Sequence, residues 1–278
     1  MLLALITACT PSNQPTPTPK PSPTSTPQPT STRAPPTASP TPTTLACLTG
    51  PGRVESGKIE STKPPQEFFI YLPPCYDGEI ERHYPVLYLL HGQTFTADQW
   101  IRLGAVDVIN QLIRSGESDP FIVVFPDDRY WNLPAGTGFG QRLVDDLIPY
   151  IDETYRTLPD RNHRAIGGMS RGAGWALELG LVRWDLFGTI GLHSLAVFQK
   201  DFSKIPKWLA AIPTASLPRV FMDIGDNDQE LEKALLVEAQ FNERGILHEW
   251  HLYNGDHTED YWGEHVEEYI RWYAEGWK

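Results

Sequence analysis

Arg164-Ala-Ile-Gly-Gly-Met-Ser-Arg-Gly-Ala-Gly-Trp175 is the stretch that decides the fold. An apolar run ends in Gly168-Met-Ser-Arg-Gly172, and a helix-compatible stretch over residues 175–182 follows at once. This is a G-x-S-x-G pattern in a strand–turn–helix context. Glycines two residues to either side of the serine remove Cβ atoms that would clash in so sharp a turn, and the helix N-terminus favours a developing negative charge. The pattern predicts that Ser170 is a nucleophile; a chance Gly/Ser turn is the alternative.

Apolar runs alternate with helical patterns on both sides of this stretch. The runs expected as strands cover residues 86–90, 121–125, 164–167, 189–192, 219–224 and 247–253. Helical patterns cover 105–115, 142–155, 175–182, 229–244 and 259–275, and an antiparallel pair of strands is expected over 54–61 and 67–72. The alternation predicts βαβ units, and hence an α/β fold with a mostly parallel sheet and helices on both faces. In such a sheet, functional side chains gather in the loops after the carboxyl ends of the strands.

Two of these loops carry the groups that a serine nucleophile needs, a base and an acid that orients it. The turn Asn254-Gly-Asp-His257 follows the last expected strand, and His257 fits the base best among the eight histidines. The turn Gly225-Asp-Asn-Asp228 follows the strand before it, in the order serine, acid, histidine. The residues alone do not decide whether the acid is Asp226, Asp228 or the nearby Asp223. A helix N-cap is the alternative role for Asp228.

The loop His91-Gly-Gln-Thr94 directly follows the strand over residues 86–90. An oxyanion hole is expected here, built from one backbone N–H of this loop and from the N–H that follows the serine. Gln93 and Arg171 are the residues expected to provide these two donors. His91 is expected to support the loop, and an ordinary strand-end glycine turn is the alternative.

Taken together in chain order, these motifs resemble the esterase family of α/β hydrolases, which includes feruloyl and acetylxylan esterases, siderophore esterases, S-formylglutathione hydrolase and the mycolyltransferases. The resemblance extends from about Tyr71 to Trp272. It rests on the following stretches: Tyr71-Leu-Pro-Pro74, Tyr84-Pro-Val-Leu-Tyr-Leu-Leu-His-Gly92 with Trp100, Asp146-Leu-Ile-Pro-Tyr-Ile-Asp152, Gly168-Met-Ser-Arg-Gly172, Gly225-Asp-Asn-Asp228 and Gly255-Asp-His257.

The resemblance implies an α/β-hydrolase fold for residues 45–278. It also implies a serine carboxylic-ester hydrolase that works through an acyl-enzyme on carbohydrate or phenolic-acid (feruloyl or acetyl) esters, without a cofactor. The feruloyl esterase branch has its acid at the end of a G-x-x-D turn, which corresponds to Asp228, with Asp226 as the alternative. An acyltransferase of the mycolyltransferase type and a catalytically inactive, glycan-binding surface lipoprotein are the alternative functions.

Aromatic side chains around the expected site suggest where a substrate lies, because such rings stack well on sugars and phenolic acids. The loop over residues 127–140 carries several of them, and a histidine follows the strand over 189–192. The residues expected to contact the substrate are Trp100, Tyr130, Trp131, Phe139 and His193.

The N-terminal residues differ in composition from the rest. Residues 1–9 end in Ile6-Thr-Ala-Cys9 and resemble a bacterial lipobox, which predicts the remnant of a signal peptide and a lipidated Cys9. A misassigned N-terminus with an ordinary cysteine is the alternative. Residues 10–44 contain 12 of the 26 prolines, interleaved with Thr and Ser, and are expected to form a disordered tether. The protein is therefore expected outside the cytoplasm, secreted or held at a bacterial surface.

The net charge and the cysteines limit the kinds of binding partner and site that are expected. Residues 45–278 carry 21 basic and 35 acidic residues, a net charge of −14, which argues against nucleic acid or an anionic membrane surface as a partner. Contact with a membrane is expected only through the lipid at Cys9. Cys47 and Cys75 are expected to form a disulfide if the domain is exported. No H-x-H or H-E-x-x-H spacing predicts a metal site. The oligomeric state is left open.

Overall fold

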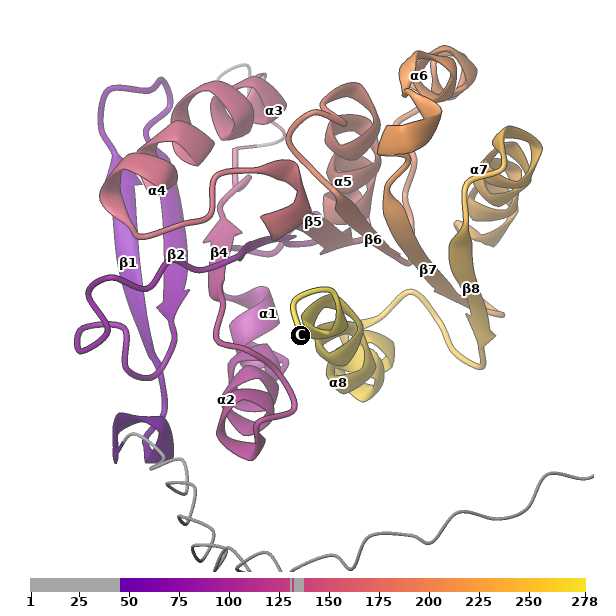
Figure 1. The fold of residues 1–278 in the computed structure, drawn as a ribbon. Helices are drawn as coiled ribbons and strands as arrows, with labels where there is room; N and C mark the ends of the chain where they lie inside the picture. The colour runs from indigo at the N-terminus through magenta and orange to yellow at the C-terminus, as the bar shows by residue number, and fades with distance from the viewer. Residues whose placement is uncertain (1–45, 131, 133–137) are drawn as a thin grey trace, which may run out of the picture. The chain divides into compact units, whose positions relative to one another are not determined.

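The computed structural model describes residues 46–130, 132 and 138–278 (Figure 1). These residues form an eight-stranded sheet in the order β1-β2-β4-β3-β5-β6-β7-β8. The strands are β1 (Arg53–Ile59), β2 (Gln66–Leu72), β3 (Val86–Leu90), β4 (Ile122–Pro126), β5 (Arg164–Met169), β6 (Thr189–His193), β7 (Arg219–Gly225) and β8 (His248–Tyr253). β1 pairs antiparallel with β2, and β2 with β4, while β3 to β8 pair in parallel. The predicted antiparallel pair and mostly parallel sheet are confirmed.

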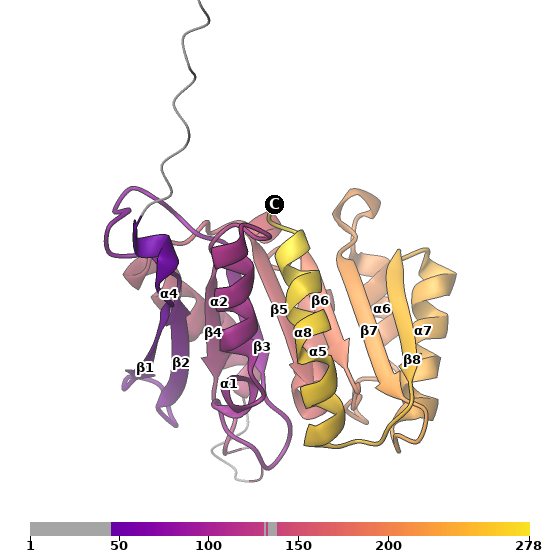
Figure 2. The same cartoon turned by 90° about the horizontal axis from the view of Figure 1, so that it is seen from below.

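Helices cover both faces of the sheet, as Figures 1 and 2 show. One face carries α3 (Phe139–Arg142), η3 (Leu143–Leu147), α4 (Ile148–Thr154), α5 (Arg171–Val182), α6 (Ile205–Ala211) and α7 (Leu231–Arg244). The other face carries α1 (Gln99–Arg102), α2 (Ala105–Ser115) and α8 (Glu259–Glu275). Short 3₁₀ turns lie at η1 (Ala46–Thr49), η4 (Arg161–His163) and η5 (Thr214–Ser216). The sequence did not predict α1 or α6, because four and seven residues are too few for a helical period to stand out.

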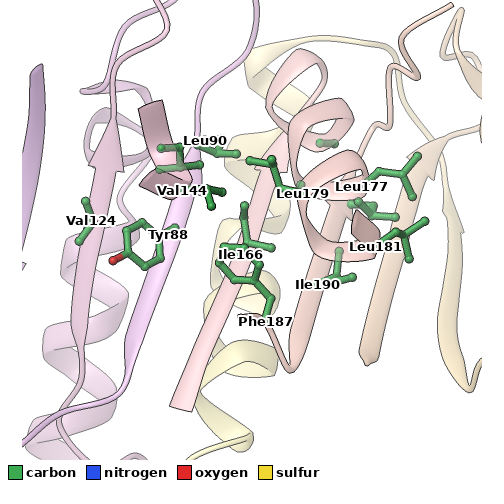
Figure 3. Packing of buried hydrophobic residues seen from close by; sticks show 14 of the residues in the cluster. Tyr88, Leu90, Val124, Val144, Ile166, Leu177, Leu179, Leu181, Phe187 and Ile190 are labelled. Atoms are coloured by element: carbon green, nitrogen blue, oxygen red, sulfur yellow. The ribbon is translucent and has the colours of Figure 1, made fainter. Parts of the chain in front are cut away.

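Burial on both faces explains why the central strands read as continuous apolar runs. Along β3, Tyr88 and Leu90 belong to the cluster that packs under α5, while Leu87 and Leu89 belong to the cluster under α2 and α8. Figure 3 shows part of the first cluster, which includes the following side chains: Tyr88, Leu90, Val124, Val144, Ile166, Leu177, Leu179, Leu181, Phe187 and Ile190. Each large apolar side chain removed from water in this way contributes about 1.5–3 kcal/mol. The two clusters hold the parallel strands and their C-terminal loops in place.

The helix expected over residues 142–155 is divided in three. η3 is a π-helix, and the amide of Ile148 bonds to the carbonyl of Leu143, five residues earlier. Pro149 follows at the start of α4, and it has no N–H for a hydrogen bond to the preceding turn. The wider π turn before the proline is the kind of local adjustment by which a helix passes such a position.

A disulfide joins Cys47, in η1, to Cys75, in the turn after β2, across a sequence separation of 28 residues. The predicted pairing is confirmed. Cys9 and the predicted tether lie outside the described residues. Within residues 46–130, 132 and 138–278, no helix has the length and apolar character needed to cross a membrane.

Removal of the disulfide tests how far it stabilises the N-terminal edge of the domain. The double variant Cys47→Ala/Cys75→Ala is expected to lose about 3 kcal/mol of unfolding free energy, because its denatured chain is no longer closed into a loop. Urea unfolding of the variant and of the oxidised wild type measures the difference, and reduced wild type serves as the matched control. Equal midpoints for variant and oxidised wild type would show that the link constrains nothing.

Candidate active site

Ser170 lies in the sharp turn between β5 and α5. Its φ of 55° and ψ of −117° are strained values for a residue with a side chain. The turn passes very close to β3, since a Cβ atom on Gly172 would lie 2.3 Å from the carbonyl oxygen of Leu90. A Cβ atom on Gly168 would lie 2.4 Å from the Gly172 carbonyl carbon. Glycine at these two positions is therefore what allows the turn to form.

Three residues from different loops meet at this turn. The Nε2 atom of His257 lies 2.7 Å from the Oγ atom of Ser170. The Nδ1 atom of His257 lies 2.9 and 2.8 Å from the two carboxylate oxygens of Asp228. An ionised carboxylate only accepts hydrogen bonds, so Nδ1 carries a proton, and in the neutral imidazole Nε2 is then the acceptor that faces the serine hydroxyl. Ser170 follows β5, Asp228 follows β7 and His257 follows β8, all at the carboxyl ends of parallel strands.

Asp228 is buried, and its surroundings favour the charged form. Burial by itself raises the pKa of this carboxyl group, but the hydrogen bonds from His257 and from the Glu230 amide outweigh it, so that the pKa lies below the ordinary value. The Glu230 amide donates at 2.8 Å. Asp226 is exposed instead, and it accepts from the backbone N–H of Gly255 at 3.1 Å. Of these two candidate acids, only Asp228 contacts the imidazole of His257.

Asp223, the third candidate acid, is buried on the α8 side of the sheet. Its carboxylate contacts Nδ1 of His193 at 2.6 Å and accepts from the hydroxyls of Tyr261 at 2.8 Å and Tyr269 at 2.6 Å. Burial, and then the charge of Asp223, raise the pKa of both tyrosines, which therefore stay protonated as donors. This group ties α8 to β6 and β7 and does not reach His257.

The loop after β3 is held from two sides. Its Gly92 amide donates to Oε1 of Gln99 at 2.7 Å, and Thr94 adopts a positive φ of 71°. His91 is buried, with Nδ1 2.7 Å from the Gly92 carbonyl, and Nε2 accepts from the Asp128 amide at 2.8 Å. Burial lowers the pKa of His91, which keeps it neutral, as an imidazole that both donates and accepts must be. His91 thus fastens the loop to the residues after β4.

A cavity of about 600 Å³ opens beside Ser170 and His257. Gln93 and Arg171, the two predicted oxyanion donors, both line it. Its wall combines apolar and aromatic side chains with charged ones, namely Phe95, Val197, Phe198 and Trp262 with Glu230, Lys233 and Glu259. Such a wall suits a ligand with an apolar ring and polar substituents.

Four of the five residues expected to contact a substrate do not line this cavity: Trp100, Tyr130, Phe139 and His193. Trp100, Phe139 and His193 have no exposed surface, and the structure corrects all three predictions. The Trp100 indole donates to the Leu90 carbonyl at 3.0 Å, Phe139 packs against the Trp175 ring, and His193 binds Asp223. Tyr130 is half-buried and lies outside the lining. Trp131 lies outside the described residues.

Three aromatic lining residues were not predicted: Phe95, Phe198 and Trp262. Phe95 comes one residue after His91-Gly-Gln-Thr94, and Trp262 comes five residues after His257. Their closeness in sequence to these two motifs could have identified them. Phe198 follows β6 by five residues and carried no such signal.

The chain is similar to known esterases. The family model described as "Putative esterase" matches residues 59–273. An endo-1,4-beta-xylanase/feruloyl esterase of Xylanibacter ruminicola is 32% identical over 206 residues, which make up 68% of this chain and 27% of that protein. An esterase of Mycobacterium tuberculosis is 30% identical over 157 residues, 52% of this chain and 31% of that protein. The match thus covers less than a third of the length of these curated relatives.

Among solved structures, a ferulic acid esterase superposes with a TM-score of 0.72 at 24% identity, over 82% of this chain and 100% of that one. An S-formylglutathione hydrolase from Staphylococcus aureus gives a TM-score of 0.64 at 15% identity, over 80% and 97%. With the sheet order described above, these likenesses confirm the predicted α/β-hydrolase fold.

The unfolding free energy at acidic pH tests the environment of Asp228. Its folded-state pKa lies below 3.8, so the ionised carboxylate stabilises the fold above about pH 4, and this contribution is lost as the pH falls through the folded-state pKa. The advantage of wild type over Asp228→Asn in unfolding free energy is therefore expected to shrink as the pH falls below about 4. Urea unfolding followed by tryptophan fluorescence measures it, with Asp226→Asn as the exposed control. A constant advantage over this range would contradict the assignment.

Proposed function

Since the chain belongs to this esterase family, we propose that it is a serine carboxylic-ester hydrolase in which Ser170, His257 and Asp228 form the catalytic triad. The observation that carries the proposal is the unbroken set of contacts from Asp228 through His257 to Ser170, with 2.8 Å on one side of the imidazole and 2.7 Å on the other. Those contacts lie at the wall of the cavity, where an ester carbonyl has access to the hydroxyl.

In the proposed mechanism, Ser170 Oγ bonds to the ester carbonyl carbon while its proton moves to His257 Nε2. Asp228 holds the imidazole in the tautomer that accepts this proton and stabilises the imidazolium that forms. The carbonyl electrons move onto oxygen, where the amides of Gln93 and Arg171 donate to the oxyanion, each worth about 3 kcal/mol in the transition state. When the carbon–oxygen bond breaks, His257 returns the proton to the leaving alcohol. Water then attacks the acyl-enzyme by the same steps.

Esters of phenolic acids or of carbohydrates are the proposed substrates. The relatives support this class, since the Xylanibacter ruminicola protein is an endo-1,4-beta-xylanase/feruloyl esterase. The cavity wall supports it as well, because Phe95, Phe198 and Trp262 offer ring surface beside the charged groups of Glu230 and Lys233.

Action outside the cytoplasm is also part of the proposal. The disulfide between Cys47 and Cys75 supports it, because such links persist in oxidising compartments. The lipobox-like sequence that ends in Cys9 supports a lipid anchor at that residue.

Replacement of the proposed nucleophile tests the function directly. Ser170→Ala is expected to lower kcat for p-nitrophenyl acetate and methyl ferulate by about 10⁴- to 10⁶-fold, because no oxygen remains to form the acyl-enzyme. Ser216→Ala is the matched control, since Ser216 precedes β7 and lies at the opposite edge of the sheet. A fluorophosphonate probe is expected to label wild type at Ser170 and to leave Ser170→Ala unlabelled. Wild-type activity or labelling in Ser170→Ala would refute the proposal.

The acid is tested by two matched variants. Asp228→Asn is expected to lower kcat by about 10³- to 10⁴-fold. The neutral amide that replaces the carboxylate does not stabilise the imidazolium, and it does not hold His257 in the tautomer with the proton on Nδ1. Asp226→Asn removes a carboxylate two residues away and is expected to retain kcat within about threefold. Steady-state kinetics on one aryl ester decides between them, and a larger loss in Asp226→Asn would move the role to that residue.

A further inference from the structure

We propose that Asp128 is a positioning residue that holds both halves of the predicted oxyanion hole in place. The inference rests on the proposed function and goes beyond it, because Asp128 belongs neither to the triad nor to the two donor residues. It follows β4 by two residues and does not line the cavity beside Ser170. Its main chain is bonded to the loop that carries Gln93, and its side chain is bonded to Arg171.

The main chain of Asp128 fixes the loop after β3. Its amide donates to Nε2 of the buried His91 at 2.8 Å. Nδ1 of the same ring then donates to the Gly92 carbonyl at 2.7 Å. This carbonyl and the N–H of Gln93 belong to one planar peptide unit, so the direction of one sets the direction of the other. The imidazole that Asp128 holds therefore orients the first predicted donor.

The side chain of Asp128 fixes the start of α5. Its Oδ2 atom accepts from Nε of Arg171 at 2.8 Å and from Nε1 of Trp175 at 2.9 Å. Arg171 is the first residue of α5, and Trp175 lies on the same face of the helix because it is four residues further on. Two attachments about one turn apart prevent the helix start from rotating about its axis. The direction of the Arg171 amide, the second predicted donor, depends on that rotation.

Burial argues that the contact between Asp128 and Arg171 is more than a general fastening. The exposed fractions of the two side chains are 6% and 17%. A buried ion pair adds little net stability, because removing both charges from water offsets their attraction. What the pair provides is a fixed geometry. One residue thus ties together three strand-end loops, those after β3, β4 and β5, at the place where a single carbonyl oxygen needs two donors.

Removal of the carboxylate is the first test. In Asp128→Ala, kcat for p-nitrophenyl acetate is expected to fall about 10- to 100-fold while KM changes less than about twofold, because an oxyanion donor acts in the transition state. Asp152→Ala is the matched control, since it breaks another buried Asp–Arg pair, with Arg164 at the start of β5, and is expected to retain kcat. A wild-type kcat in Asp128→Ala overturns the proposal.

The conservative variant separates position from charge. Both hydrogen bonds to the Asp128 carboxylate end on Oδ2, and Oδ1 accepts none from the residues that the structure describes. An asparagine carbonyl at the place of Oδ2 keeps both bonds, so Asp128→Asn is expected to lower kcat less than about fivefold. A loss as large as that in Asp128→Ala overturns the proposal.

Arg171→Met tests the same contact from the other side and carries the test if Asp128→Ala does not fold. It keeps the backbone amide of residue 171 and is expected to lower kcat about 10- to 100-fold. In this background the effect of Asp128→Ala is expected to shrink to less than about threefold, since the partner that it holds is gone. A wild-type kcat in Arg171→Met, or an undiminished effect in the double variant, overturns the proposal.

Phenylboronic acid gives a readout that a purely structural role would not move. Ser170 Oγ bonds to boron while its proton moves to His257, and one boron oxygen takes the place of the oxyanion. The inhibition constant for Asp128→Ala is expected to rise by about the factor by which kcat falls. An unchanged inhibition constant overturns the proposal. If Ser170→Ala is inactive and Asp128→Ala keeps its kcat, only the positioning role fails, whereas an active Ser170→Ala refutes the proposed function itself.

Discussion

The close passage of the β5–α5 turn over the end of β3 is the contact on which the site depends. Gly172 lies against the carbonyl oxygen of Leu90, at a separation that excludes any Cβ atom. The residue after Leu90 begins the loop that carries Gly92 and Gln93, so the same contact places this loop beside Ser170. A Cβ atom on Gly92 would lie 3.7 Å from that of Ser170. One steric constraint thus sets both the strained serine and its distance from the predicted oxyanion donors.

The position of the imidazole is set from the other face of the sheet. His257 directly precedes α8, and buried hydrogen bonds from Tyr261 and Tyr269 to Asp223 fasten that helix beneath β6 and β7. Asp223 is itself a strand residue, so its carboxylate is a fixed point. The position of His257, the proposed base, therefore depends more on the packing of the whole helix α8 than on the short turn that contains His257.

The sequence predicted the sheet and the residues that meet at its edge because both depend on short, local sequence patterns. Apolar runs mark strands that are buried on two faces, and a G-x-S-x-G pattern between strand and helix marks the turn of Ser170. The positions of the histidines relative to the expected strands and helices then singled out His257, which follows the last strand. The choice between Asp226 and Asp228 did not follow from spacing, because it depends on which side chain turns inward, and only the resemblance favoured Asp228.

Three of the expected substrate contacts were wrong for a related reason. An aromatic residue in a loop packs into the core or faces the cavity according to its orientation, which composition does not record. Trp100, Phe139 and His193 point into the core, while Phe95 and Trp262 face the cavity. The π turn of η3 and the short helices α1 and α6 escaped prediction because each covers too few residues for a period to emerge.

The order of the loops along the chain has a consequence during synthesis. Ser170 leaves the ribosome well before Asp228 and His257, which follow the last two strands of the sheet. Until β8 pairs with β7 and α8 docks, the hydroxyl has no imidazole beside it. In the proposed mechanism, the serine of a nascent chain is therefore inert, and its reactivity arises only after the final strand of the sheet has formed.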